Sequence, residues 1–311
     1  MDLEQRILKL VSSKNSYIHD DCAYLSKSEQ LISTDTLVES VHFNLKHFDA
    51  SKIAHRLFVC NYSDIQSSGG YPEYALLNIS FPNKSFKITQ QIIKFFKKLL
   101  TKHNIKLIGG DTTSSSKIYL SSTFISEPIK KSEIINRKNA NVGDSIYTFK
   151  NIGFSKLGYL SIFKKQNLNK NLLRKSKDQF LKPKIITYSN LFNKYKINSC
   201  MDISDSLYSS LNELSKQSKK KFLIDNLKEI SPLLLKNLNY KNYFSLVLSS
   251  GEEFVPVFTG KLTKQDIKFF KLNRIHIIKI GSVQKGQGVT FTELENFKNN
   301  TFSHFKKTYS N

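Results

Sequence analysis

Residues 31–43 read LISTDTLVESVHF. A short apolar run leads into Ser33, Thr34 and Asp35, and His42 follows a few residues later. Apolar and β-branched residues favour a strand, so we expect the strand to end at Asp35 and to present its oxygens at a sheet edge. Acids are a minority in this chain, with 25 Asp and Glu against 48 Lys and Arg. This strand end is therefore a candidate site.

The length and the alternation of patterns predict two mixed units. A chain of 311 residues is long enough for one large domain or two ordinary domains. Strand patterns occupy 76–81 and 117–126, and an amphipathic helix pattern occupies 85–104. We predict an α+β or α/β fold, with a first domain at 1–135 and a second at 136–311.

The composition limits the partners and the compartment. The net charge is +23, but the lysines are scattered and no DNA-binding motif accompanies them, so we do not expect a nucleic-acid partner. No apolar run approaches the roughly 20 residues of a membrane span, and the N-terminus lacks the pattern of a secretory signal. Cys22, Cys60 and Cys200 show no CxxC spacing. We expect reduced thiols in a cytoplasmic protein without a membrane partner.

Several acids fall at predicted strand ends or turns. HDDCA (19–23) is a paired-carboxylate turn, and IGGDTTSSS (108–116) places an acid after two glycines. MDISDSL (201–207) sets two acids at the mouth of a predicted helix, with Ser204 or Asp205 as its expected N-cap. Each segment alone is most often a turn or a helix cap. Because an acid at the end of a regular element recurs in several separate segments, we favour a shared site for these acids.

Asp64 differs because it lies within a predicted helix at 51–66. Leu57, Cys60 and Asp64 stand on one stripe of that helix, where a carboxylate is costly unless something neutralises it. Carboxylates that converge repel one another, and a divalent cation relieves the repulsion. Asp and hydroxyl oxygens without His or Cys favour Mg²⁺ over Zn²⁺.

Such a magnesium site implies phosphoryl-transfer chemistry. Mg²⁺ held by carboxylates usually keeps positions for phosphate oxygens and neutralises their charge during phosphoryl transfer. The sequence contains neither the G-x-x-x-x-G-K-[ST] motif nor the protein-kinase signature set. The residues alone therefore predict a metal-dependent enzyme that acts on phosphates. If it binds a nucleotide, it does so with a scaffold other than the P-loop or the protein-kinase fold.

Six motifs in order carry a resemblance to a known family: HDDCA, STDTLVESVHF, CNYSDIQSSGGYP, IGGDTT, MDISDSL and SGEEF. They resemble thiamine-monophosphate kinase, a family in the superfamily of aminoimidazole ribonucleotide synthetase. The resemblance implies an N-terminal sheet that forms a barrel-like homodimer and a C-terminal α/β sandwich. It also implies direct in-line transfer of the ATP γ-phosphate to thiamine monophosphate, with several Mg²⁺ ions.

The resemblance also implies roles for individual residues. It assigns Mg²⁺ binding to Asp21, Ser33, Thr34, Asp35, Asp64, Asp111, Asp202 and Asp205. It assigns the catalytic group to Asp64, Asp111 and Asp205. It assigns contacts with ATP to Gly110, Asp111, Arg137 and Ser204. It assigns contacts with the substrate to His42, Glu252 and Phe302.

The chain departs from the family pattern mainly at glycines. His19 precedes the paired acids where the family usually has glycine, Ser206 follows MDISD, and Ser250 begins the SGEEF motif. Ser114 and Ser115 replace the usual Arg-Gly after GGDTT. These changes alter local backbone freedom around the nucleotide, but none removes a predicted carboxylate.

Two other functions stay open at this point. One is another ATP-dependent enzyme of the superfamily, such as aminoimidazole ribonucleotide synthetase, selenophosphate synthetase or a hydrogenase-maturation dehydratase. Selenophosphate synthetase is expected to carry a reactive cysteine in a glycine-rich N-terminal segment, and the maturation dehydratase is expected to end in a cysteine. We find neither feature in this sequence, which ends in TFSHFKKTYSN. The other is a non-catalytic basic binding protein, against which the full set of acids argues.

Overall fold

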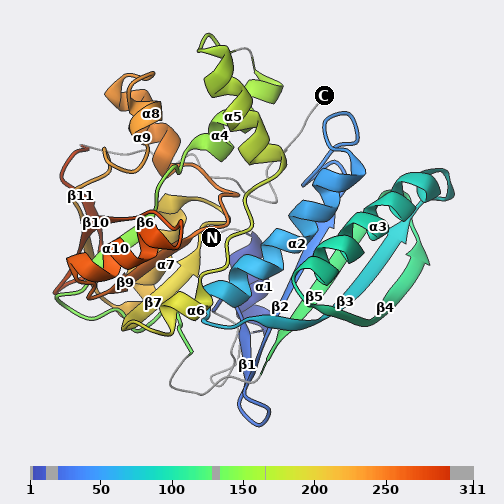
Figure 1. Cartoon of the computed structure of the whole chain (residues 1–311), viewed down its shortest axis with the longest axis horizontal. Helices are drawn as coiled ribbons and strands as arrows, with labels where there is room; N and C mark the ends of the chain where they lie inside the picture. Colours follow the sequence, from blue (N-terminus) through green and yellow to red (C-terminus); the bar gives the residue numbers. More distant parts are fainter. Residues whose placement is uncertain (1–2, 12–19, 128–133, 165, 295–311) are drawn as a thin grey trace.

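Two mixed sheets organise the chain in the computed structural model, which describes residues 3–11, 20–127, 134–164 and 166–294 (Figure 1). Five strands form the N-terminal sheet in the order β1-β2-β5-β3-β4. Six strands form the C-terminal sheet in the order β11-β8-β10-β6-β9-β7. The predicted α+β architecture is confirmed. Among the described residues, no helix combines the length and the apolar character that crossing a membrane requires.

The N-terminal sheet is antiparallel except for the pair β3–β4. Helices α2 and α3 cover one of its faces (Figure 1). The elements of this half are α1 (Leu3–Val11), β1 (Ala23–Leu25), β2 (Gln30–Val38), α2 (Ala50–Ser67), β3 (Pro72–Phe81), the 3₁₀ turn η1 (Asn83–Ser85), α3 (Phe86–Lys102), β4 (Lys106–Ser114) and β5 (Tyr119–Ser126).

The C-terminal sheet pairs β11 with β8 in parallel and its other neighbours antiparallel. Its strands are β6 (Ser145–Phe149), β7 (Ile197–Asp202), β8 (Lys221–Ile224), β9 (Pro256–Gly260), β10 (Ile277–Gln284) and β11 (Gly288–Phe291). Its helices are α4 (Phe154–Phe163), α5 (Lys170–Leu181), α6 (Ser189–Phe192), α7 (Leu207–Ser218), α8 (Pro232–Leu235), α9 (Tyr240–Leu248) and α10 (Lys264–Leu272).

Helix α2 carries the core of the N-terminal half. Its side chains Leu57, Phe58 and Ile65 are fully buried, and the ring of Phe58 stacks on that of Tyr62. The carboxylate of Asp49 caps the helix by accepting the backbone N–H of Lys52 at 2.9 Å. Most of the side chains of α2 are buried between the N-terminal sheet and the C-terminal half, and this packing explains why the segment is helical although its sequence mixes polar and apolar residues.

The two halves share packed side chains. Phe180 of α5 belongs to the N-terminal core, and Tyr159 and Phe163 of α4 pack against the same core. Residues beyond 136 thus contribute side chains to the N-terminal core, and the division at 135 and 136 stays a prediction.

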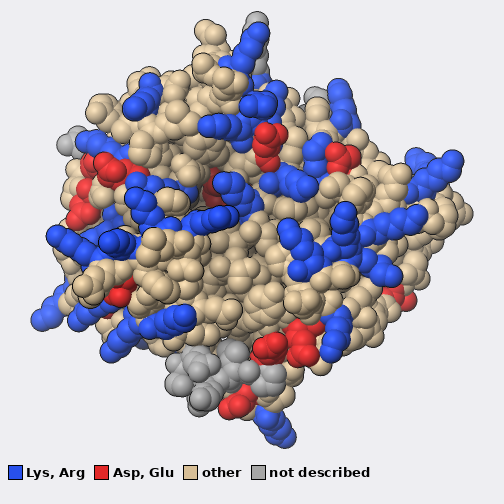
Figure 2. All heavy atoms as spheres, viewed as in Figure 1, with Lys and Arg blue, Asp and Glu red and all other residues tan. Residues whose placement is uncertain are grey.

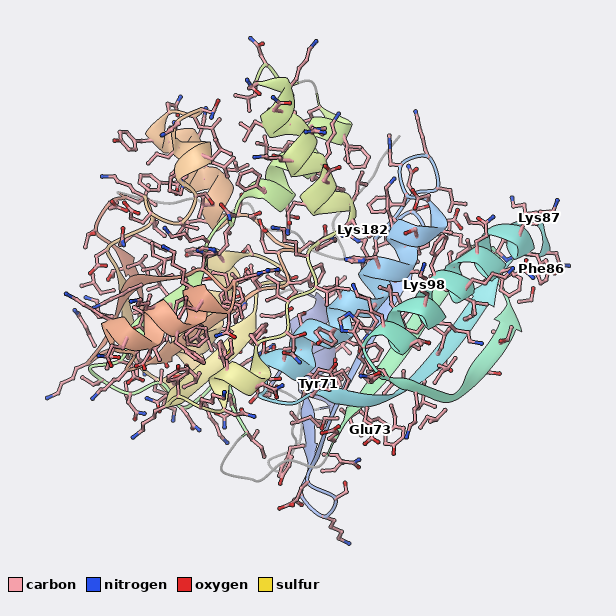
Figure 3. All side chains as sticks on the ribbon, in the orientation of Figure 1. Tyr71, Glu73, Phe86, Lys87, Lys98 and Lys182 are labelled. Carbon is pink, nitrogen blue, oxygen red and sulfur yellow. The ribbon has the colours of Figure 1, made fainter. Side chains whose placement is uncertain are left out.

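Lysine and arginine side chains spread over the visible face of the molecule (Figure 2). Helix α3 is typical: its exposed lysines Lys87 and Lys98 point away from the sheet (Figure 3). The structure therefore agrees with the scattered distribution of charge in the sequence.

Candidate active site

Three carboxylates from distant parts of the chain meet at the junction of the two halves. Asp21 lies in the turn before β1, Asp64 in α2, and Asp202 at the end of β7. Each offers an oxygen, and these oxygens lie within 4.8 Å of one another. We call these three residues the acidic cluster. Oxygens at this separation are close enough to share a hard cation such as Mg²⁺.

Two serines hold carboxylates of the acidic cluster by short hydrogen bonds. The Ser33 hydroxyl donates to Asp64 Oδ2 at 2.6 Å, and the Ser63 hydroxyl donates to Asp202 Oδ2 at 2.6 Å. Asn61 supports this arrangement because its amide donates to Ser122 Oγ at 2.8 Å, which ties α2 to β5. The sequence predicted Ser33 as part of the site but did not predict Ser63. The available signal was that Ser63 directly precedes Asp64 in the predicted helix.

Arg137 is a cation that contacts the acidic cluster directly. Its Nη2 donates to Asp21 Oδ1 at 2.5 Å, and its Nε donates to the same oxygen at 3.2 Å. Its backbone N–H donates to Asp20 Oδ2 at 3.3 Å. Asp21 Oδ2, the other oxygen of that carboxylate, is buried and has no hydrogen-bond partner among the described residues. Arg137, for which a contact with ATP is predicted, thus forms an ion pair with a predicted metal ligand.

Burial and neighbouring carboxylates disfavour the ionised form of the acids in the acidic cluster, and a nearby positive charge would favour it. Burial first, then the charge of Asp35, raises the pKa of Asp64 well above its ordinary value. Burial and Asp21 raise the pKa of Asp202 to about 8, and burial raises that of Asp20 to about 7. A bound divalent cation would reverse these shifts by favouring the ionised carboxylates. The buried unpaired oxygen and the oxygen donor set fit Mg²⁺.

Strand β2 divides its predicted ligands between two faces. The strand continues to Val38, so the expectation that it ends at Asp35 is wrong. Thr36 and Val38 are β-branched and extend the pairing with β5. Side chains alternate along a strand, so Ser33 and Asp35 share the face toward α2. Thr34 lies on the other face, where its hydroxyl bonds that of Thr123 at 2.9 Å.

Gly110 and Asp111 lie at the far edge of the same sheet. They belong to β4, a strand whose residues are all exposed, and not to a loop after a strand. Pairing aligns Asp35 with Ser122, Ser122 with Leu77, and Leu77 with Gly110. Three strand spacings put β4 about 14 Å from β2. The structure therefore does not bring Asp111 to the acidic cluster of its own chain.

Gly110 has a steric reason to be glycine. A Cβ atom at this position would lie 1.9 Å from the carbonyl oxygen of Leu77. Since no side chain fits at that distance, the second glycine of IGGDTT keeps β3 and β4 paired.

The loop after β7 holds two more predicted residues. Ser204 and Asp205 are exposed, and the N-cap of α7 is Ser206, whose Oγ accepts the N–H of Ser209 at 3.0 Å. The expected cap at Ser204 or Asp205 is therefore wrong by one or two residues. A Cβ at Gly251 would lie 2.1 Å from the carbonyl oxygen of Asp205, so the 250–254 loop packs directly on this one.

The predicted substrate residues lie at separate elements. His42 folds back on β2, and its Nδ1 accepts the N–H of Val38 at 2.9 Å. Glu252 pairs with Arg56 of α2, a contact that the sequence did not suggest. The available signal was that Arg56 is a basic residue about two turns before Asp64 on the same helix. Phe302 lies outside the described residues, as does His19.

Comparison with known proteins agrees with the motifs and the fold. The model of the family "AIR synthase related protein, N-terminal domain" matches residues 19–126. The thiamine-monophosphate kinase of Buchnera aphidicola subsp. Schizaphis graminum is 35% identical over 309 residues, covering 93% of this chain and 92% of that protein. The chain belongs to the thiamine-monophosphate kinase family. The family member of Nitrosopumilus maritimus is 30% identical and covers 92% of each chain.

Solved structures extend this family assignment to the whole fold. AaThiL complexed with AMPPCP and TMP superposes with a TM-score of 0.81 at 25% identity, covering 97% of this chain and 96% of that chain. Hydrogenase maturation protein HypE of E. coli has the same fold, with a TM-score of 0.68 at 13% identity and coverage of 89% and 88%. This chain and HypE thus have the same fold, while the sequence places this chain among the thiamine-monophosphate kinases.

Proposed function

We propose that this chain transfers the γ-phosphate of ATP to thiamine monophosphate, giving thiamine diphosphate and ADP. Membership of the thiamine-monophosphate kinase family supports the reaction, and the likeness to AaThiL complexed with AMPPCP and TMP supports both substrates. The observation that carries the mechanism is the acidic cluster, with its buried unpaired Asp21 oxygen.

The acidic cluster is the proposed site of several Mg²⁺ ions, together with Ser33, Asp35 and Asp205. Bound Mg²⁺ neutralises the charge that develops on the polyphosphate during transfer. The chain's own part is orientation: Ser33 and Ser63 fix one oxygen each of Asp64 and Asp202. Fixed ligands lower the reorganisation needed when phosphates bind.

Transfer is proposed to be direct. A phosphate oxygen of thiamine monophosphate attacks the γ-phosphorus in line, and the bond from that phosphorus to the β,γ-bridging oxygen breaks as ADP leaves. Burial raises the pKa of Cys22, Cys60 and Cys200 well above the ordinary thiol value. Protonated thiols are poor nucleophiles, which supports a route without a covalent phosphocysteine. Reduced thiols also support a cytoplasmic location.

A homodimer is the proposed working form. Strand β4 ends the N-terminal sheet and exposes Leu107 by 39% and Ile108 by 55%. Such an edge is a template for pairing with another chain. At the opposite edge, β1 has three residues and leaves β2 close to the border of the sheet. Pairing of β4 with that border of a second copy closes two sheets into a barrel.

The same pairing would complete the site. Asp111 is about 14 Å from β2 within one chain, a distance too large for a shared Mg²⁺ ion. In the barrel, the partner subunit's Asp111 would lie next to Asp35. We therefore assign Gly110 and Asp111 to the nucleotide and metal site of the other copy.

The direct test is an assay of the purified protein with ATP, Mg²⁺ and thiamine monophosphate, with thiamine diphosphate as the readout. Thiamine without a phosphate serves as the control acceptor, because the proposed chemistry requires an acceptor phosphate. Formation of thiamine diphosphate only when all three components are present supports the proposal. Absence of the product at any Mg²⁺ concentration overturns it.

A further inference from the structure

Arg56 is a fully buried arginine on α2, the helix that carries Asp64. Its side chain is 1% exposed, and its guanidinium carbon lies 5.2 Å from the ring centre of Phe48 and 5.0 Å from that of Phe180. Its Nη1 donates to the carbonyl oxygen of Phe180 at 2.7 Å. Burial of a cation is costly unless its donors and its charge are satisfied, and here two rings and a carbonyl hold it in one position.

The charge of Arg56 is balanced by a residue nearly two hundred positions away. Its Nη2 donates to Oε1 of Glu252 in the 250–254 loop. Arg56 is thus the rigid side of the ion pair, because its planar group is fixed at both ends. The Glu252 side chain keeps 33% of its surface exposed. One carboxylate oxygen is held, while the side chain can still meet a bound molecule.

The backbone of Glu252 is held as firmly as its side chain. Its N–H donates to the carbonyl oxygen of Ser204 at 2.5 Å, and its φ is 54°. That left-handed conformation is uncommon for a residue with a side chain and persists where the surroundings enforce it. The Glu252 carboxylate therefore has one defined position beside the loop that follows Asp202.

The distance along α2 matches the length of a small substrate. Arg56 precedes Asp64 by eight residues, which corresponds to about 12 Å along the helix axis. Thiamine monophosphate has a phosphate at one end and a thiazolium cation and an aminopyrimidine ring beyond it. With the phosphate at the acidic cluster, the ring portion reaches toward Glu252.

We propose that Arg56 is a positioning residue for the substrate, acting through Glu252. It aims one oxygen of Glu252 away from the site and leaves the other for the amino group or the cationic ring of the substrate. This role rests on the proposed function, because it requires Glu252 to contact thiamine monophosphate. One helix then sets both ends of the site, with Asp64 at the phosphate end and Arg56 at the ring end.

The test separates binding of the substrate from binding of ATP. Arg56→Met keeps the length and apolar stem of the side chain but removes its charge and its donors. We expect the KM for thiamine monophosphate to rise roughly tenfold or more, while the KM for ATP changes less than about twofold. Arg56→Lys keeps the charge without the planar fork, so we expect a smaller rise. Arg174→Met on α5, where the arginine is exposed, is the matched control and should leave both constants unchanged.

Three outcomes decide the matter. A rise in the KM for thiamine monophosphate alone, partly rescued in Arg56→Lys, supports the positioning role. A lower Tm with equal changes in both KM values means that Arg56 has only a structural role, and this overturns the proposal. If Arg56→Met fails to fold, the same comparison is made with Arg56→Lys. Glu252→Gln with a normal KM for thiamine monophosphate overturns the substrate contact itself, while the kinase assay of the unchanged protein tests the reaction separately.

Discussion

Glu253 is a buried carboxylate, the acidic cluster combines one buried and two half-buried residues, and the surroundings of the two regions differ. Glu253 is 2% exposed. Its Oε1 accepts hydrogen bonds from the N–H of Gly153 at 2.7 Å, the N–H of Ser155 at 3.2 Å and the hydroxyl of Ser250 at 2.6 Å. Two of these donors belong to the start of α4. This carboxylate therefore fastens a helix N-terminus to the 250–254 loop and has a structural role.

The acidic cluster is satisfied less completely than Glu253. Its three members place oxygens within 4.8 Å of one another, and one buried oxygen of Asp21 has no hydrogen-bond partner in the part of the chain that the structure describes. Among the described residues, its side-chain donors include Ser33, Ser63 and Arg137. Burial alone therefore does not separate the two kinds of acid. We propose that the acids without enough nearby positive charge are the functional ones, because a metal ion supplies that charge.

The largest effect is expected for Asp64→Asn. A neutral amide keeps the shape of the side chain but cannot balance the charge of bound cations. We expect kcat to fall by about a thousandfold or more, with an intact fold. Steady-state kinetics measures the loss, and thermal unfolding with and without Mg²⁺ measures the coupling. Mg²⁺ should raise the Tm of the original protein and not that of the variant.

Near-normal turnover in Asp64→Asn would remove Asp64 from the metal site and make the acidic cluster comparable to Glu253. Glu213→Gln is a suitable control for loss of a carboxylate, since Glu213 lies on α7 and pairs with Lys216 at its own helix surface. Both its turnover and its response to Mg²⁺ should be unchanged.

A mixed dimer tests whether Asp111 serves the partner's acidic cluster. Asp64→Asn and Asp111→Asn chains with different tags are co-expressed, and the mixed dimer is purified through both tags. If the sites are shared between copies, one site of the mixed dimer carries both changes and the other carries none. We then expect about half of the original activity per dimer, although each parent dimer is nearly inactive. An inactive mixed dimer would show that each chain builds its own site.

Glu253 provides the structural side of the comparison. Glu253→Ala leaves two backbone N–H groups and one hydroxyl buried without their acceptor, so we expect a loss of about 2–3 kcal/mol in the free energy of unfolding. Glu253→Gln keeps Oε1 as an acceptor and should lose much less. Denaturant unfolding measures both. An equally large loss in Glu253→Gln would mean that the negative charge, and not the acceptor, stabilises the start of α4.

The pH dependence of stability sharpens this prediction. Burial raises the pKa of Glu253 from 4.5 to about 7, so the folded state holds its proton more tightly than the unfolded state. The share of Glu253 in the free energy of unfolding therefore falls as the pH rises from about 4.5 to about 7 and is constant above that range. Glu253→Gln lacks this titration. The stability of the original protein relative to Glu253→Gln should decline across that interval, and a constant difference would contradict the shift.

The sequence allowed the fold and the chemistry of the site to be predicted further than its assembly. The stripe of Leu57, Cys60 and Asp64 predicted a carboxylate on a buried helix face, because helical periodicity is local information. The same periodicity does not reveal which strand will meet that face. The contact of Asp202 with Ser63 depends on the packing of β7 against α2, which brings together residues 139 positions apart.

Errors in the predicted strand ends have one physical source. IGGDTT reads as a turn because glycines favour turns, yet Gly110 is glycine so that β4 can approach Leu77. STD was expected to end its strand, yet pairing with β5 carries β2 on to Val38. Cross-strand pairing overrides local propensity in both places. Arg56 was missed for a related reason, since its partner Glu252 becomes a neighbour only after the two halves pack.

The smallest expected effect distinguishes neighbouring hydroxyls on β2. The Ser33 hydroxyl donates to Asp64 Oδ2 at 2.6 Å, whereas the Thr34 hydroxyl bonds that of Thr123 on the opposite face. Ser33→Ala should raise the Mg²⁺ concentration for half-maximal activity by roughly tenfold, because it removes the hydroxyl from the proposed site and frees the Asp64 carboxylate that this hydroxyl orients. Thr34→Ala should change it by less than about twofold, because the Thr34 side chain lies on the face of β2 away from Asp64. A Mg²⁺ titration of activity measures both. Equal losses would mean that the Thr34 side chain reaches the metal site, and the strict alternation of faces along β2 would have to be abandoned.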